Sequence, residues 1–180
     1  MLARWPGFGY ARRSVTTPVL IYMASPLGFS QAGRHFSVTV LVPFVESLGF
    51  EALDPWTLTD PNRIAAVQAL PYGPARREAW RALNHEMGAT NRTAIDAAAG
   101  VVAVLDGVDV DSGTAAEIGY AFAQRKLIVG YRGDFRLSAD NEGGIVNLQV
   151  EYFIRESGGT IVERYEDLAP ALAALRGGLA

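Results

Sequence analysis

A run of five apolar residues, VVAVL at positions 101–105, constrains the fold of this 180-residue chain more than any other segment. Such a run is typical of a strand buried on both faces, as the strands of a parallel sheet are. Four carboxylates follow within twelve positions, and a helical pattern begins among them: Asp106, Asp109, Asp111 and Glu117. Carboxylates are costly to gather unless solvent or a ligand compensates them, and open α/β folds bind ligands where parallel strands end. The segment therefore predicts an active site at the carboxyl edge of a sheet.

The acids beside this helix also have a simpler explanation. Asp111 or Ser112 can cap the helix, and Glu117 can complement the helix dipole. The face turned to the sheet is expected to comprise Ala115, Ile118 and Phe122. Glu117 is expected off that face, in a mostly small-sided neighbourhood of Gly113, Tyr120 and Ala121. That neighbourhood leaves room for a substrate, which favours a functional role for Glu117.

Apolar and amphipathic segments alternate along the whole chain. Strands are expected at residues 19–24, 50–53, 101–105, 126–131 and 160–162. Helices are expected at residues 30–48 (with Pro43 kinking or breaking it), 90–99 and 165–175 and in the segment after 111. Loops and less regular structure are expected at residues 57–88 (loop plus irregular helix), 134–144 (polar loop) and 145–156 (helix or strand). The alternation predicts a single-domain α/β fold, a Rossmann- or flavodoxin-like parallel sheet with helices on both faces.

The first 18 residues differ from the rest. They hold three Arg and no acid, and the first carboxylate of the chain is Glu46. We expect residues 1–18 to be a flexible N-terminal extension, with a transit peptide as the alternative, and residues 19–180 to form the domain.

Composition excludes several classes of partner and cofactor. A net charge of −3 argues against a nucleic-acid partner, and no apolar run reaches the ~20 residues of a membrane helix. The chain has no Cys, and His35 and His85 are unpaired, so neither a metal nor thiolate chemistry is expected. No glycine-rich phosphate loop is present, and we expect no organic cofactor. The lack of cysteine is compatible with the cytoplasm, where we expect the protein.

Four ordered blocks resemble one family. DGVDVDSGTAAEIGYA at residues 106–121 resembles the signature of the nucleoside 2-deoxyribosyltransferases, and IYMASPL at 21–27 resembles their opening strand and loop. GYRGDFR at 130–136 and VNLQ at 146–149 match later family segments in order and approximate spacing. The resemblance runs from about residue 19 to residue 168.

This resemblance implies a set of catalytic and sugar-binding residues. Glu117 matches the nucleophile, Tyr22 the tyrosine that orients it, and Asp111 the residue that holds the sugar hydroxyls. Chemically, a carboxylate can capture the oxocarbenium-like state of N-glycosidic cleavage, and a tyrosine hydroxyl can fix one of its oxygens. Asn147 and Gln149 match positions that reach the sugar pocket of a neighbouring subunit, which implies a homo-oligomer with shared sites. The simpler explanation is that these two amides cap a helix or lie on the surface as ordinary polar side chains.

The same resemblance indicates a nucleobase side. Asp54 and Trp56 fall where the family places base-proximal residues, although Trp56 can equally be a core or rim residue. Asn91 occupies a position where some relatives have aspartate. An asparagine can pair with a base edge but cannot donate a proton as a general acid, so the donor is Asp54, Asp111 or a water. Close backbone approach to the ligand is expected at Gly28, Gly107 and Gly113.

Three functions remain in competition. The first is a glycosyltransferase of nucleoside salvage, which exchanges the base of 2′-deoxynucleosides through a 2-deoxyribosyl-Glu117 intermediate and binds nucleosides and free nucleobases. The second is an N-glycosidase that uses the same residues and water, acting on nucleosides or nucleoside monophosphates; Arg132 and Arg136 leave a phosphate contact open. The third is a non-catalytic nucleotide-binding domain.

Overall fold

Five parallel strands form the centre of the computed structural model, which describes residues 18–176. They are β1 (Val19–Ala24), β2 (Phe50–Leu53), β3 (Gly100–Val104), β4 (Leu127–Tyr131) and β5 (Ile161–Val162). Their spatial order is β2-β1-β3-β4-β5, and every neighbouring pair is parallel. This is the flavodoxin-like order, in which the connections change direction between β1 and β3. The predicted single-domain α/β fold is confirmed.

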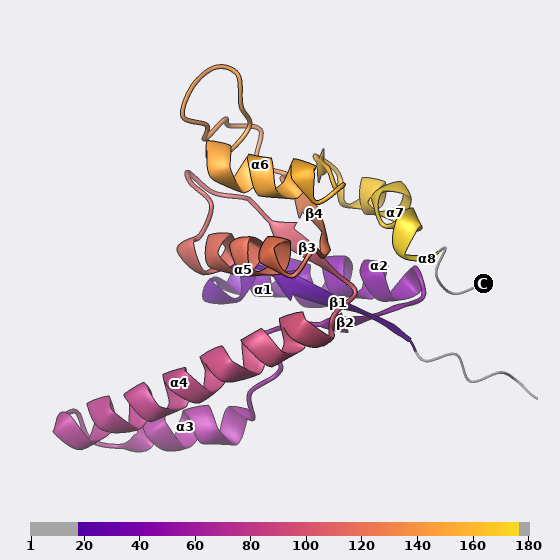
Figure 1. Ribbon diagram of the computed structural model, residues 1–180. Helices are drawn as coiled ribbons and strands as arrows, with labels where there is room; N and C mark the ends of the chain where they lie inside the picture. The colour runs from indigo at the N-terminus through magenta and orange to yellow at the C-terminus, as the bar shows by residue number, and fades with distance from the viewer. Residues whose placement is uncertain (1–17, 177–180) are drawn as a thin grey trace, which may run out of the picture.

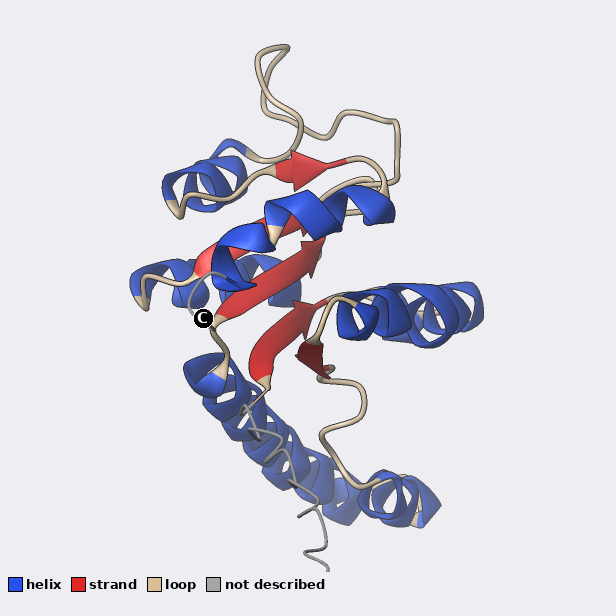
Figure 2. Ribbon diagram, turned by 90° about the vertical axis from the view of Figure 1, so that its right-hand side faces the viewer, coloured by secondary structure: helices blue, strands red, loops and turns tan. Residues whose placement is uncertain are grey.

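Helices cover both faces of the sheet (Figures 1 and 2). One face packs against α4 (Pro74–Ala97), α5 (Ser112–Ala123) and α6 (Leu148–Glu156). The other packs against α1 (Gln31–Phe36), α2 (Val42–Ser47), α7 (Leu168–Ala171) and α8 (Ala173–Arg176). Alternate residues of each strand feed the two cores: in β1, Tyr22 and Ala24 belong to the first, and Ile21 and Met23 to the second.

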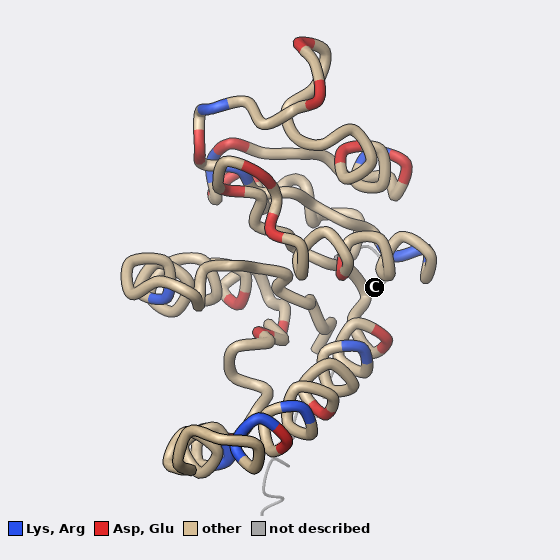
Figure 3. Tube along the Cα trace, turned by 90° about the vertical axis from the view of Figure 1, so that its left-hand side faces the viewer, with Lys and Arg blue, Asp and Glu red and all other residues tan. Residues whose placement is uncertain are grey.

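Residues 57–88 contain the predicted loop and helix, but the helices are regular and longer than predicted, because prolines there start helices. The segment forms α3 (Pro61–Ala69) and most of the 24-residue α4, which also includes the helix predicted at 90–99. Pro61 and Pro74 lie in the first turns of these helices, where a missing N–H costs nothing. In Figure 1, α3 and the first half of α4 project from the sheet as a hairpin. Both signs of charge alternate along α4 (Figure 3).

Proline also explains two smaller differences. The helix predicted at residues 30–48 contains a wide π turn, Ser37–Leu41, between α1 and α2. Pro43 lies just after that turn, which accommodates its missing N–H. The helix predicted at 165–175 is divided into a 3₁₀ turn, Tyr165–Asp167, followed by α7 with Pro170 and by α8. The ambiguous segment 145–156 forms α6, a helix. The extension predicted at residues 1–18 lies, except for Pro18, outside the described residues.

Candidate active site

A tyrosine and a glutamate meet at the carboxyl edge of the sheet. Tyr22 is the fourth residue of β1 and is fully buried, whereas Glu117 is half-buried on α5. The Tyr22 hydroxyl donates a hydrogen bond of 2.6 Å to Oε1 of Glu117. In the sheet, Tyr22 pairs with Val101 of β3, and β3 leads into α5 through the acidic loop. The strand order therefore brings together two residues that are 95 positions apart in sequence.

Burial governs the protonation of this pair. Desolvation raises the pKa of Glu117, the Tyr22 hydrogen bond opposes this rise, and the nearby Asp111 adds to it. Desolvation and the Glu117 carboxylate together raise the pKa of Tyr22 well above its usual range, so its hydroxyl stays a donor. The simpler explanation, that Glu117 complements the helix dipole, does not hold, since α5 begins at Ser112 and Glu117 lies in its second turn, beyond the reach of the terminal dipole.

Asp111 caps α5, as the simpler explanation for this residue predicted. One carboxylate oxygen, Oδ2, accepts a hydrogen bond of 3.0 Å from the backbone N–H of Thr114. The buried face of α5 comprises Thr114, Ile118 and Ala121. Ala121 was predicted off this face and is fully buried, because the helix presents a face centred one residue away from the predicted one. Gly113 is exposed in the first turn of the helix. The sugar-binding roles of Asp111 and Gly113 stay predictions.

The loop after β2 holds a buried carboxylate and an indole. Asp54 is only 6% exposed; its Oδ1 accepts a hydrogen bond of 3.0 Å from the backbone N–H of Trp56. Desolvation raises the pKa of Asp54, and this hydrogen bond opposes the rise. The Trp56 indole N–H donates to the Ser25 carbonyl at 2.9 Å, which ties the loops after β1 and β2 together. The environment of Asp54 is therefore closer to that of a proton donor than to that of a solvated loop acid.

Gly28 has a different neighbour from the expected one. A Cβ at Gly28 would lie 1.9 Å from Cδ2 of Trp56, so the glycine makes room for the indole and not for a ligand. Phe29 packs edge-on against the same ring, at 4.6 Å between centroids. Trp56 remains 37% exposed, which leaves part of its surface for another ring.

The three predicted amide residues differ in how their side chains are engaged. Asn91 is half-buried on α4, and its side chain has no hydrogen-bond partner among residues 18–176. Asn147 caps α6: its Oδ1 accepts from the backbone N–H groups of Gln149 at 3.0 Å and Val150 at 3.4 Å. Gln149 is exposed in the first turn of α6. The capping explanation therefore applies to Asn147, and the contacts of both amides with a second subunit stay predictions.

The loop after β4 contains interactions that the sequence did not indicate. Asp106 accepts a hydrogen bond of 2.8 Å at Oδ1 from the backbone N–H of Asp134. Arg136 pairs with Asp134, and this interaction holds the pKa of the Asp134 carboxyl well below its usual range. Arg132 is almost completely buried, with its guanidinium on backbone carbonyls. Except for Arg136 and Asp134, these partners lie 25 to 28 residues apart, so no local pattern reveals them.

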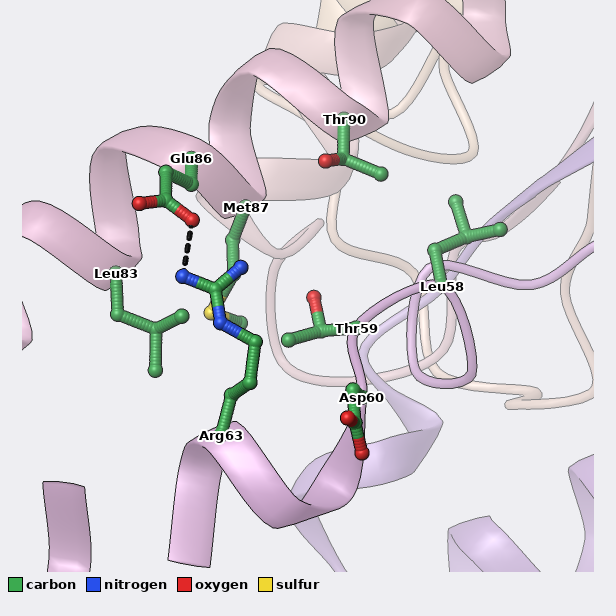
Figure 4. Close-up of a pocket in the computed structure, with 8 residues that line it drawn as sticks. All are labelled: Leu58, Thr59, Asp60, Arg63, Leu83, Glu86, Met87 and Thr90. Carbon is green, nitrogen blue, oxygen red and sulfur yellow. Dashed lines mark hydrogen bonds and ion pairs between the residues drawn. The ribbon is translucent and has the colours of Figure 1, made fainter. Parts of the chain in front are cut away.

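Two cavities lie beside the loop after β2. A cavity of about 250 Å³ separates α3 from α4, and in it Arg63 and Glu86 point toward each other and form an ion pair (Figure 4). A larger, mostly apolar cavity of about 440 Å³ lies between α4 and the strands β1 and β2. Leu58 lines both cavities, whereas neither contains Tyr22 or Glu117.

Two classes of feature are missing from the described part of the chain. No three His, Asp or Glu side chains within residues 18–176 lie close enough together to hold a metal ion. Over the same residues, none of the helices combines the length and the apolar character that crossing a bilayer requires.

Comparison with known proteins identifies the family. The profile of the nucleoside 2-deoxyribosyltransferases matches residues 21–149, more than half of the chain. A conserved protein from Enterococcus faecalis has a similar structure, with a TM-score of 0.58 and 22% identity over 88% of this chain and 99% of that chain. A 2-desoxiribosyltransferase from Leishmania mexicana is similar with a TM-score of 0.57 and 21% identity, over 88% and 97% of the two chains.

A 2-deoxyribosyltransferase from Bacillus psychrosaccharolyticus gives a TM-score of 0.55 and 21% identity, over 84% of this chain and 90% of that chain. At this level of identity the structural likeness supports the shared fold alone. No curated protein matches the sequence significantly. The family profile confirms the resemblance found in the sequence, and the chain belongs to the nucleoside 2-deoxyribosyltransferase family.

Proposed function

We propose that this protein exchanges the base of 2′-deoxynucleosides through a covalent intermediate on Glu117. The observation that carries the proposal is the hydrogen bond of 2.6 Å between the Tyr22 hydroxyl and Glu117, at the carboxyl edge of the sheet in a member of this family. A carboxylate oxygen of Glu117 attacks the anomeric carbon, the C–N bond breaks, and a second base displaces Glu117 from the sugar. Two inversions give net retention at the anomeric carbon.

The departing base takes a proton, and Asp54 is the proposed donor. Asp54 is buried at the start of the loop after β2, and its raised pKa favours the protonated form at higher pH than an ordinary aspartate. Asp111 is a weaker candidate because its carboxylate is engaged in capping α5. Asn91 cannot supply the proton, but its unengaged amide can pair with the edge of a base. Trp56 offers the exposed part of its indole for stacking.

Unphosphorylated nucleosides and free bases are the proposed substrates. The two arginines that could contact a 5′-phosphate are both engaged: Arg132 with backbone carbonyls and Arg136 with Asp134. A phosphate would have to displace these partners, at the cost of the interactions they make. This supports a nucleoside over a nucleoside monophosphate.

The choice between transfer and hydrolysis has a direct test. The protein is incubated with deoxyinosine plus adenine, and with deoxyinosine alone, while deoxyadenosine, hypoxanthine and free deoxyribose are quantified. We expect deoxyadenosine to form only with both reactants and free sugar to stay a minor product, and we expect neither with Glu117→Ala. Free sugar released equally with and without adenine would identify an N-glycosidase instead. Nucleoside binding without any product would identify a binding domain.

We also propose a homo-oligomer in which Asn147 and Gln149 complete the sugar pocket of a neighbouring subunit. Two large side chains on α6 support an interface there, because Leu148 is 60% and Tyr152 is 52% exposed in the single chain. A cytoplasmic location and a role in nucleoside salvage accompany this proposal as predictions.

A further inference from the structure

Arg132 is a buried cation whose guanidinium donates to no carboxylate among residues 18–176, although its charge helps to lower the pKa of the nearby Asp134. It follows β4 directly and is only 2% exposed. Its guanidinium donates to three backbone carbonyls: those of Leu105, Gly107 (at 3.2 Å) and Arg136. Across residues 18–176, Arg132 forms no ion pair, and its Nε has no hydrogen-bond partner.

Core packing does not account for this guanidinium. Removing a charge from water costs several kcal/mol even after the protein relaxes, and carbonyl acceptors recover only part of that. A methionine of similar length would fill the same space without the cost. The charge and the fork of donors are therefore the features of Arg132 that need an explanation.

The hydrogen-bond partners of Arg132 explain why a charged guanidinium lies there. Leu105 and Gly107 flank Asp106, at the start of the acidic loop that ends at Asp111 and α5. The loop turns sharply there, since Gly107 has a φ of +129°. A second bond of opposite polarity joins the same two loops, from the backbone N–H of Asp134 to the Asp106 carboxylate at 2.8 Å. The loop after β3 is thus fixed to the loop after β4 at three consecutive residues.

The positive charge of Arg132 also affects the acidic loop. Four carboxylates lie between positions 106 and 117, and like charges repel one another more strongly where water is partly excluded, as between Asp111 and the half-buried Glu117. A guanidinium held under the start of this loop offsets part of that repulsion.

We propose that Arg132 is a positioning residue, which holds the loop 105–111 so that Asp111 and Glu117 face the sugar. The proposal rests on the proposed function only in assigning the sugar to Glu117. Arg132 does not touch substrate in this scheme; it acts through the carbonyls of Leu105 and Gly107. A shift of about 1 Å in catalytic groups can cost roughly 100-fold in rate, which sets the expected scale.

Three variants test the proposal: Arg132→Met, Arg132→Lys and, as a matched control, Arg136→Met. The control removes an arginine side chain from the same loop but leaves the Arg136 carbonyl in place. We expect Arg132→Met to lower kcat for base exchange roughly 100-fold while the KM for the accepting base changes less than about threefold, because that base binds on the Asp54 side. Arg132→Lys keeps the charge but cannot bridge three carbonyls. It should therefore regain less than about a tenth of the kcat that Arg132→Met loses. Arg136→Met should stay within about twofold of the wild type.

Hydrogen exchange gives a readout that does not depend on activity. We expect the backbone amides of residues 106–114 to exchange faster in both Arg132 variants and normally in the control, with the strands β1 and β3 unchanged. If Arg132→Met does not fold, the Lys variant carries the test. Wild-type kcat and wild-type protection in Arg132→Lys would overturn the proposal. If the wild-type protein does not exchange bases, the proposed function fails. The hydrogen-exchange data then still decide whether Arg132 holds the loop.

Discussion

Replacing Tyr22 with phenylalanine tests the central contact of the candidate site. The change removes one oxygen from a fully buried side chain and leaves the ring, so the core around β1 loses almost no apolar contact. What is lost is the donor of the 2.6 Å hydrogen bond to Oε1 of Glu117. We expect the folded structure to persist and the nucleophile to lose its orientation.

The size of the effect follows from the charge on the acceptor. A hydrogen bond to a charged group contributes about 1.5–3 kcal/mol. Each ~1.4 kcal/mol of transition-state stabilisation is worth a factor of ten, so kcat/KM should fall about 10- to 150-fold. The same bond lowers the pKa of Glu117, whose desolvation raises it. Without the bond the pKa of Glu117 rises further, and the loss should deepen as the pH falls.

The assay is the initial rate of deoxyadenosine formation from deoxyinosine and adenine, measured across pH. Glu117 must be ionised to attack, so the acid limb of kcat/KM reports its pKa in the free enzyme. This limb should move to higher pH in Tyr22→Phe. Tyr120→Phe is the matched control, because the Tyr120 hydroxyl donates to the Asp96 carboxylate at 2.7 Å on the exposed side of α5. The control should change neither the rate nor the limb.

Two outcomes would refute this reasoning. A loss as deep as that of Glu117→Ala would mean that Tyr22 takes part directly in the chemistry. An unchanged rate together with an unchanged acid limb would mean that the hydrogen bond neither orients nor stabilises the carboxylate.

Four further predictions concern the nucleophile, its charged neighbour, cofactors and the subunit contact. Glu117→Ala should lower exchange by several orders of magnitude with cooperative melting retained, and a 2-fluoro nucleoside should label Glu117 in the wild type; near-normal turnover would contradict the assignment. Asp111→Asn keeps the helix cap but removes a charge that raises the pKa of Glu117, so the acid limb should move to lower pH, and a move to higher pH would count against it. A chelator should leave activity unchanged, whereas loss that a divalent ion restores would reveal a metal requirement. Mixed Glu117→Ala and Asn147→Ala proteins should regain part of the wild-type activity by subunit exchange; a fully active monomer in light scattering would exclude shared sites.

The prolines show where local patterns mislead. A proline interrupts a helix in its interior but is well accommodated in its first turn, and the surrounding residues do not say which position it occupies. Pro61 and Pro74 lie in such first turns, so most of the segment 57–88, where loop and irregular helix were predicted, belongs to two regular helices. Only the packing of α3 on α4, and of α4 on the sheet, shows where these helices begin.

The sequence by itself determined the parallel α/β fold and the family. Buried strands produce short apolar runs, and the acids after the run at 101–105 lie at the carboxyl edge whatever the strand order is. The family resemblance also singled out Glu117 as the nucleophile and Tyr22 as the tyrosine that orients it.

The tertiary structure alone provides the contacts through which these groups meet. The hydrogen bond from Tyr22 to Glu117 depends on β1 lying beside β3 in a register that pairs Tyr22 with Val101. The interactions of Arg132 with Leu105 and Gly107 depend in the same way on β4 lying beside β3. The raised pKa of Glu117 depends on how many atoms exclude water from its side chain. Strand order, register and desolvation arise from contacts between distant segments, and no local pattern in the chain encodes them.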